Sequence, residues 1–283
     1  MNKRRDFIKL AGTGLLAAGV GAVYGTEPQK VKVQEVKGKK TPDTFGIGIA
    51  GYTFFQIPPE KAIEIMKKVG VLNLSLKDVY MPMNSTKEKI TSVMGTFKEA
   101  GINVYTLGVI YMKSEQAVDQ AFEYAKMAGV KMIIGAPNYE FLPLVEKKVK
   151  EYDMKIAIHN HGPDNPLFPN ATDIWNRIKD LDPRMGICLD IGHTTRDGQD
   201  PSVDVERYAK RIYDIHIKDV TLATKDGKTI EMGRGIIDIP KFIKVLRRIK
   251  YSGMCSLEFE KDMKDPIAGI AESIGYFKGV MAV

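Results

Sequence analysis

The sequence of 283 residues predicts an α/β protein with one domain, a closed (β/α)8 or TIM barrel. Short apolar runs of strand type alternate with helical patterns from residue 44 to the end, which indicates a parallel sheet. Eight such units fill roughly 240 residues, as in a closed barrel. The first strand-to-helix turn lacks the glycine-rich sequence of a doubly wound open sheet, so we prefer the barrel.

The eight predicted strands are short apolar runs bounded by turn-forming or polar residues. Their starts lie about 25–31 residues apart, except that the seventh unit is longer. The runs begin near Gly46, Val71, Ile102, Val130, Lys155, Gly186, Ile212 and Met254.

The helical patterns between these strands carry start and stop signals. The first, Pro58–Val69, begins with proline and is closed by Gly70. The others are Thr86–Ala100, Ser114–Ala128, Phe141–Tyr152, Asn170–Lys179, Val203–Arg211, Pro240–Ile249 and Ile267–Gly279.

The longer seventh unit contains the segment Thr221–Asp238. Its Asp226-Gly227 pair is a turn signal between two short strand-like pieces, which predicts a small hairpin over the mouth of the barrel. Arg234 follows between two glycines. It is a candidate for binding the substrate, and an ordinary solvated loop arginine is the alternative.

The N-terminal segment is read as a targeting sequence and not as part of the fold. Residues 1–25 carry paired arginines, then Phe and Lys, then an apolar run of small residues, which resembles a twin-arginine export signal. Residues 26–43 are polar and rich in lysine, and are read as a linker to the barrel at 44–283. We expect export to the periplasm with no stable membrane span in the mature chain, or an N-terminal membrane anchor if the signal is not cleaved.

The charge of the chain argues against nucleic-acid binding, and the positions of its two cysteines argue against a disulfide. The formal charge is +7, of which the first 25 residues contribute +3, and no dense basic stripe indicates nucleic-acid binding. Cys188 shares the strand face of Asp190, whereas Cys255 points to the opposite face from Glu258. Two buried free thiols are therefore expected instead of a disulfide.

All four histidines of the chain lie at the ends of three successive late strands, which is where TIM-barrel enzymes place their sites. Clustered imidazoles and carboxylates are costly to bury together unless a cation joins them. We therefore predict a site for one divalent metal ion, either Mn, Zn, Co or Fe. The predicted ligands are His159, Asp190, His216 and Glu258, and the predicted substrate-binding residues are His161, His193 and Glu260, besides Arg234.

From Phe45 onward the chain resembles the sugar phosphate isomerase/epimerase family, the xylose isomerase-like barrels. The motifs that carry this resemblance are LDIGH at Leu189–His193, HIKD at His216–Asp219, GRGIID at Gly233–Asp238 and SLEFE at Ser256–Glu260. The resemblance implies one divalent metal bound by Glu, Asp, His and Glu from strands five to eight. The corresponding positions here are His159, Asp190, His216 and Glu258, so this chain departs from the family pattern at His159.

The expected activity is metal-dependent isomerisation or epimerisation of a small-molecule carbohydrate through proton abstraction next to a carbonyl, that is, enediolate chemistry. Glu258 is the expected base, and His159 would have to take the place of a second carboxylate. Lys218 either donates to a substrate oxygen or only pairs with Asp219. The alternatives are a metal-dependent lyase or hydrolase on oxidised sugars or glycosides, and a non-catalytic sugar-binding barrel; a homo-oligomer is left open.

Overall fold

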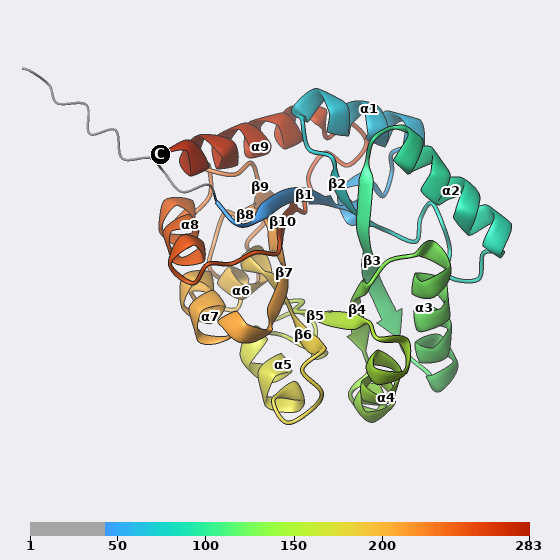
Figure 1. The fold of residues 1–283 in the computed structure, drawn as a ribbon. Helices are drawn as coiled ribbons and strands as arrows, with labels where there is room; N and C mark the ends of the chain where they lie inside the picture. Colours follow the sequence, from blue (N-terminus) through green and yellow to red (C-terminus); the bar gives the residue numbers. More distant parts are fainter. Residues whose placement is uncertain (1–42) are drawn as a thin grey trace, which may run out of the picture. The chain divides into compact units, whose positions relative to one another are not determined.

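The computed structural model describes residues 43–283, which form a closed barrel of eight parallel strands (Figure 1). The order around the barrel is β1-β10-β7-β6-β5-β4-β3-β2, so the predicted (β/α)8 fold is confirmed. The predicted export signal and residues 26–42 of the predicted linker lie outside the described residues. The strands are β1 (Gly46–Ala50), β2 (Asn73–Leu76), β3 (Asn103–Met112), β4 (Met132–Pro137), β5 (Lys155–His159), β6 (Met185–Asp190), β7 (Ile212–Ile217) and β10 (Met254–Leu257).

Helices follow the strands around the outside of the barrel, as Figure 1 shows. They are α1 (Pro59–Val69), α2 (Lys87–Glu99), α3 (Glu115–Ala128), α4 (Leu142–Tyr152), α5 (Ala171–Ile178), α6 (Ile191–Arg196), α7 (Pro201–Arg207), α8 (Ile239–Arg248) and α9 (Ile267–Ala282), with short 3-10 turns η1 (Gly51–Phe54), η2 (Tyr139–Phe141) and η3 (Ala209–Arg211). Of these helices, α6 was not predicted. It follows β6 without a loop, because Asp190 caps it by accepting a hydrogen bond from the backbone N–H of His193 at 2.7 Å.

The hydrophobic core lies on both sides of the barrel wall. The larger part packs the outward faces of the strands against the helices and includes Cys255. A smaller cluster lies inside the barrel and includes Val109, Ile134 and Cys188. The two cysteines are therefore separated by the wall of the barrel, and both are buried free thiols, as the strand alternation predicted.

A small antiparallel hairpin, β8 (Asp219–Val220) and β9 (Thr229–Ile230), lies in the predicted long seventh unit. The loop that follows it is held by Asp219, whose buried carboxylate accepts four backbone hydrogen bonds. The donors are the N–H groups of Val220, Gly233, Gly235 and Ile237, at 2.9 to 3.1 Å. A Cβ built on Gly235 would lie only 2.1 Å from this carboxylate, so the spacing of Asp219 and the two glycines is a structural requirement of the loop.

We predict that Asp219→Ala destabilises the barrel by about 3 kcal/mol or more, because it leaves four backbone donors without their acceptor. For a domain of this size the melting temperature should fall by roughly 6–12 °C in thermal unfolding. Asp226→Ala is the control, because Asp226 is exposed in the hairpin turn and its loss should cost less than about 0.5 kcal/mol. Equal stability of the two variants would contradict the anchoring role of Asp219.

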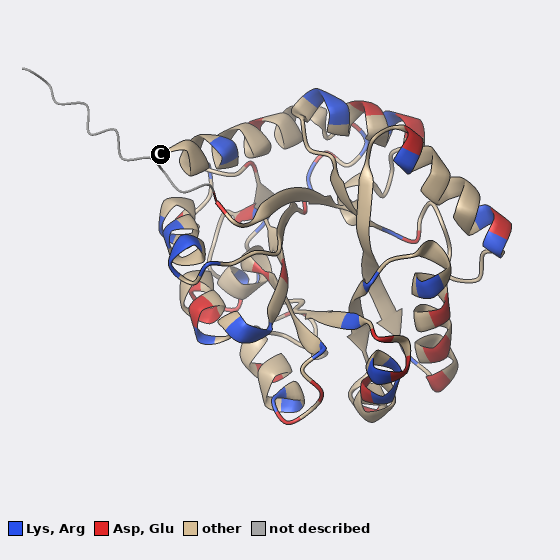
Figure 2. Cartoon of the chain, viewed as in Figure 1, with Lys and Arg blue, Asp and Glu red and all other residues tan. Residues whose placement is uncertain are grey.

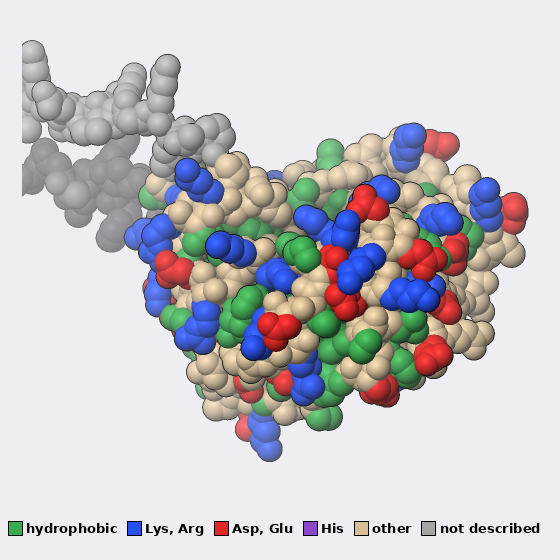
Figure 3. All heavy atoms as spheres, turned by 60° about the horizontal axis from the view of Figure 1, so that its bottom comes forward, with side chains coloured by type: hydrophobic (Ala, Val, Ile, Leu, Met, Phe, Trp, Pro, Cys, Tyr) green, Lys and Arg blue, Asp and Glu red, His purple; other side chains and the backbone are tan. Residues whose placement is uncertain are grey.

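The charged residues of the described chain lie mainly on helices and loops, while the strands are largely uncharged along their length (Figure 2). On the face shown in Figure 3, acidic and basic side chains lie near one another in the centre and on the right, while basic side chains predominate toward the left. Among residues 43–283, no helix combines the length and the apolar character needed to cross a membrane.

Candidate metal centre

The four predicted ligands come from the carboxyl ends of four neighbouring strands. His159 and Asp190 are the last residues of β5 and β6, His216 lies near the end of β7, and Glu258 directly follows β10. The strand register places Asp190 beside His216. All four residues are at most 4% exposed, so the structure brings the predicted quartet together in a buried position.

The polar atoms of the quartet converge. Nε2 of His159 lies 3.1 Å from Nδ1 of His216, 3.6 Å from Oδ2 of Asp190 and 4.0 Å from Oε2 of Glu258. Nδ1 of His216 lies 3.4 Å from the same oxygen of Glu258. Ligands with zinc-type bond lengths are about 3.4 Å apart in a tetrahedron. The observed separations are therefore compatible with those of a metal site.

The charge and hydrogen bonding of the quartet also fit a divalent cation. Oδ2 of Asp190, the oxygen that approaches His159, is buried and makes no hydrogen bond, and its one cationic neighbour is the Lys218 ammonium at 3.0 Å. A buried carboxylate is costly unless a cation pairs with it, and a divalent ion would share this role with the Lys218 ammonium. Asp190 and Glu258 together carry a charge of −2 when ionised, which matches one divalent ion.

Lys218 lies at the centre of the carboxylates of the site. Its ammonium nitrogen is 3.0 Å from Oδ2 of Asp190, and it donates to Glu258 at 2.8 Å and to Glu260 at 2.6 Å. Burial opposes its charge, but these carboxylates outweigh burial and raise the pKa of Lys218 well above its ordinary value. The sequence suggested an ion pair between Lys218 and Asp219. Lys218 instead pairs with Asp190, Glu258 and Glu260, while the carboxylate of Asp219 accepts hydrogen bonds from backbone N–H groups.

The same ammonium keeps the ligand carboxylates ionised. Burial alone would raise the pKa of Asp190 and of Glu258, but Lys218 and the neighbouring histidines together outweigh it and hold both pKa values below their usual range. Burial lowers the pKa of His159 to about 4, so this imidazole is neutral at pH 7. Metal coordination needs ionised carboxylates and neutral imidazoles, and at neutral pH Asp190, Glu258 and His159 meet that requirement. Burial opposes the charge of His216, but Cys188 and Glu258 outweigh it and raise the pKa of His216 well above its ordinary value, so His216 must release a proton when a metal binds.

Asn160, between the two histidines of β5, fixes the position of Asp190. Its side-chain oxygen accepts from the backbone N–H of Asp190 at 2.8 Å, and its amide donates to the backbone carbonyl of Asp190 at 3.3 Å. The amide also lies within hydrogen-bond distance of Thr194, at 3.2 Å. His159 and His161 point into the site while Asn160 points sideways to β6, as the alternation of a strand requires.

The predicted substrate-binding residues do not all reach the site. The ring of His161 lies 4.9 Å from that of His159, and the ring of His193 lies 5.9 Å from it. Glu260 reaches the site through Lys218. Arg234 does not: its side chain is 61% exposed and pairs with Glu272 of α9 on the surface.

Three residues that sequence reasoning did not single out also position the site. The hydroxyl of Tyr111 lies 3.0 Å from Nε2 of His161. Thr53 holds the backbone around Glu258, because its hydroxyl donates to the carbonyl of Leu257 at 3.1 Å and accepts from the N–H of Phe259 at 2.9 Å. Arg196 contacts Nδ1 of His193 at 3.3 Å. The contacts of Tyr111 and Thr53 join distant parts of the chain and leave no periodic signal in the sequence.

Asp214 lies inside the barrel two residues before His216, and both of its oxygens are buried without a hydrogen-bond partner. Burial raises its pKa from 3.8 to about 7. The folded protein therefore binds a proton that the unfolded chain releases near pH 4. This contribution to stability is complete below about pH 4 and is lost as the pH rises to about 7.

We predict that Asp214→Asn makes the protein more stable than the wild type at pH 7.5, by up to about 4 kcal/mol, and equally stable near pH 4. Thermal or urea unfolding between pH 4 and pH 8 measures the difference. A variant whose stability runs parallel to that of the wild type across this range would contradict the raised pKa.

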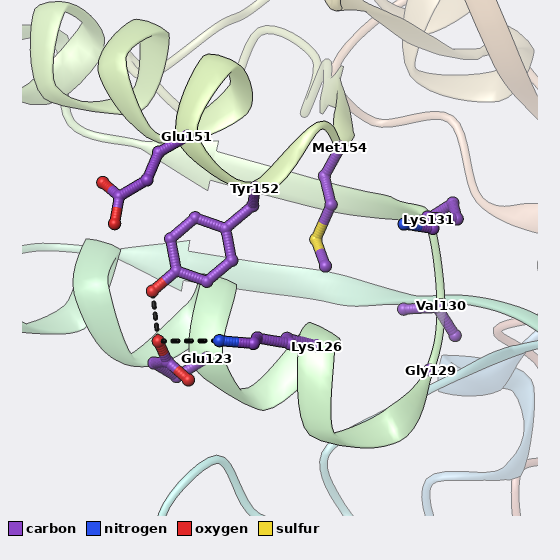
Figure 4. A pocket seen from close by; sticks show the side chains of 8 residues that line it. All are labelled: Glu123, Lys126, Gly129, Val130, Lys131, Glu151, Tyr152 and Met154. Atoms are coloured by element: carbon purple, nitrogen blue, oxygen red, sulfur yellow. Dashed lines mark hydrogen bonds and ion pairs between the residues drawn. The ribbon is translucent and has the colours of Figure 1, made fainter.

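A hollow elsewhere on the molecule is explained by packing. The hollow between α3 and α4, of about 340 Å³, includes Glu123, Lys126 and Tyr152 in its lining (Figure 4). The hydroxyl of Tyr152 donates to Glu123, and the ammonium of Lys126 lies 5.4 Å from the centre of the Tyr152 ring. These residues satisfy one another, and the predicted site residues are not part of this lining.

Comparison with known proteins gives one family. The family described as xylose isomerase-like TIM barrel matches residues 110–280. The chain is 28% identical over 132 residues to inosose dehydratase of Clostridium tetani, covering 41% of this chain and 44% of that protein. It is 26% identical over 131 residues to the rhizopine catabolism protein MocC of Rhizobium meliloti, covering 41% of this chain and 40% of that protein. The matched part thus spans about two-fifths of the length of these curated relatives.

Solved structures share the fold over most of the chain. A putative uncharacterized protein of Parabacteroides distasonis has 25% sequence identity and a TM-score of 0.66, covering 83% of this chain and 99% of that one. The IOLI protein, whose structure holds a zinc atom, has 17% identity and a TM-score of 0.67, covering 84% of this chain and 97% of that one.

Proposed function

The chain belongs to the xylose isomerase-like TIM barrel family, and on that basis we propose that it is a metal-dependent enzyme that isomerises or epimerises a sugar. The reaction begins with removal of the proton next to a carbonyl. The observation that carries this proposal is the buried His159, Asp190, His216 and Glu258 quartet, whose atoms lie within 4.8 Å of one another. The zinc atom in the IOLI protein supports metal binding by a barrel of this fold.

Each residue has a defined task in this proposal. A bound divalent ion would supply Lewis acidity, which makes the proton next to the carbonyl more acidic. Glu258 takes that proton, because it is ionised at neutral pH and lies at the mouth of the barrel. Lys218 keeps Glu258 ionised and oriented. His159 is a neutral imidazole that can return a proton only after it has first acquired one.

Loss of water from the substrate, a lyase reaction, is the second candidate. Two observations favour it: curated relatives are named inosose dehydratase, and His159 stands where a second carboxylate base would complete a symmetric exchange of the proton. Glu258 alone suffices for elimination, because after it takes the proton next to the carbonyl it can return that proton to the departing hydroxyl, which leaves as water. The substrate would then be a cyclic polyol ketone or another oxidised sugar.

We further propose that residues 1–25 direct the protein out of the cytoplasm. The paired arginines and the following apolar run of the sequence support this. Fractionation of cells, followed by N-terminal sequencing of the protein in each fraction, tests it. Full-length protein confined to the cytoplasm would contradict it.

The decisive experiment incubates aldoses, ketoses and cyclic polyol ketones with metal-loaded protein in heavy water. Deuterium at the carbon next to the carbonyl of recovered sugar supports proton abstraction, and its appearance in an isomer or epimer supports the first candidate. An unsaturated product with loss of water supports the second. Protein that is purified without metal, and gains none on incubation with Zn²⁺ or Mn²⁺, would overturn both.

A further inference from the structure

Arg196 is the last residue of α6, and its guanidinium joins three segments beside the metal centre. One nitrogen donates to Asp164, in the loop between β5 and α5, and to the carbonyl of Lys225 in the β8–β9 hairpin, the latter at 2.6 Å. The other terminal nitrogen lies 3.3 Å from Nδ1 of His193, on the same helix. The Arg196 side chain is only 15% exposed.

The contact with His193 determines where the imidazole proton is. A guanidinium has only donors, so the ring nitrogen that faces it must offer a lone pair. Nδ1 of His193 is therefore unprotonated, and the single ring proton is on Nε2. The loop backbone closes in on the same edge of the ring, since a Cβ built on Gly162 would lie 3.2 Å from Nδ1.

This assignment decides between two overlapping sets of candidate ligands. His193, Glu258 and Glu260 also lie close enough together to hold a metal ion. A nitrogen that carries a proton has no lone pair for a metal, and the nitrogen that has one is occupied by Arg196.

We infer that Arg196 is a positioning residue that holds His193 in the neutral tautomer protonated on Nε2. His193 is then a hydrogen-bond donor of the site and is barred from the metal. In the proposed reaction, on which this last step rests, the N–H of His193 contacts an oxygen of the sugar. The tautomer itself does not depend on the identity of the substrate.

The test is nuclear magnetic resonance of untagged protein labelled with ¹⁵N-histidine. The chain has four histidines, so four imidazole patterns are expected, and His193→Gln identifies the one that belongs to His193. Long-range ¹H–¹⁵N correlations show which nitrogen is protonated. In the wild type we expect Nε2–H, both without metal and after addition of Zn²⁺, which should shift His159 and His216 instead.

Three variants distinguish the effect of Arg196 on the His193 tautomer from its hydrogen bonds to the neighbouring loops. Arg196→Met removes the donor and should move His193 partly or wholly to the Nδ1–H form, while Arg196→Lys should restore the wild-type pattern. Asp164→Asn is the matched control, because it weakens the contact between Arg196 and the β5–α5 loop but leaves the Arg196 guanidinium beside His193.

Three outcomes would overturn the inference. They are Nδ1–H on His193 in the wild type, a metal-bound pattern for His193 after addition of Zn²⁺, or an unchanged pattern in folded Arg196→Met. The wild-type spectrum decides the first two even if no variant folds. Failure of the proposed function would appear separately, as absence of turnover with an unchanged His193 spectrum.

Discussion

Glu258→Gln should lower the rate of deuterium exchange next to the substrate carbonyl by about 10²- to 10⁴-fold, the range expected for loss of a general base. Glutamine keeps the shape and an oxygen that can bind a metal, but it cannot take a proton. The metal content after purification should therefore remain measurable while exchange is lost. Solvent exchange followed by mass spectrometry or NMR, with metal analysis of the same sample, measures both quantities.

Glu140→Gln is the matched control for this experiment. Glu140 lies in η2 after β4, is exposed, and contacts Asn138 instead of the quartet. It should exchange deuterium at the wild-type rate. Wild-type exchange in Glu258→Gln would remove Glu258 from the role of base, and any substrate proton would then have to leave through another residue.

Asp190→Asn should lower the affinity for the metal by at least about 100-fold, because even residues that only support a ligand typically contribute 10- to 100-fold. The substitution keeps an oxygen that can cap α6, so the fold should persist. It removes the charge of Oδ2 and leaves the Lys218 ammonium with one carboxylate less. Calorimetric titration with Zn²⁺, or competition with a chelator, measures the affinity.

Asp238→Asn controls for the effect on capping. Asp238 caps α8 by accepting from the backbone N–H of Lys241 at 2.9 Å, and it is exposed and outside the quartet. Its variant should bind the metal as the wild type does. If Asp190→Asn also binds the metal normally, Asp190 is not a ligand and the −2 charge assigned to the site is wrong.

The barrel could be predicted because its signals are local. Strand runs and helix boundaries follow from the period of apolar residues and from residues such as Gly70 and Gly129, which take the left-handed conformation at helix ends. The quartet followed from the barrel, since residues at the carboxyl ends of neighbouring parallel strands must meet.

The features that the sequence did not predict depend on how separate elements meet in the folded chain. Arg234 could not be placed, because its direction is set by Asp219, which binds the backbone of both neighbouring glycines and leaves the side chain outside. The helix α6 was missed because its cap, Asp190, is also a strand end. Lys218 could not be matched to its partners, since their distances depend on how β6, β7 and β10 meet.

The position of Lys218 has a consequence for how the protein acquires its metal. The ammonium already neutralises part of the charge of Asp190 and Glu258, so the barrel can fold with its carboxylates balanced before any ion arrives. Binding of a metal ion would then be an exchange, in which the Lys218 ammonium moves away from the carboxylate oxygens of Asp190 and Glu258 and the metal ion takes its place. Such a site gives up some affinity, and in return the barrel does not require the ion in order to fold, while a bound ion would still add stability by mass action.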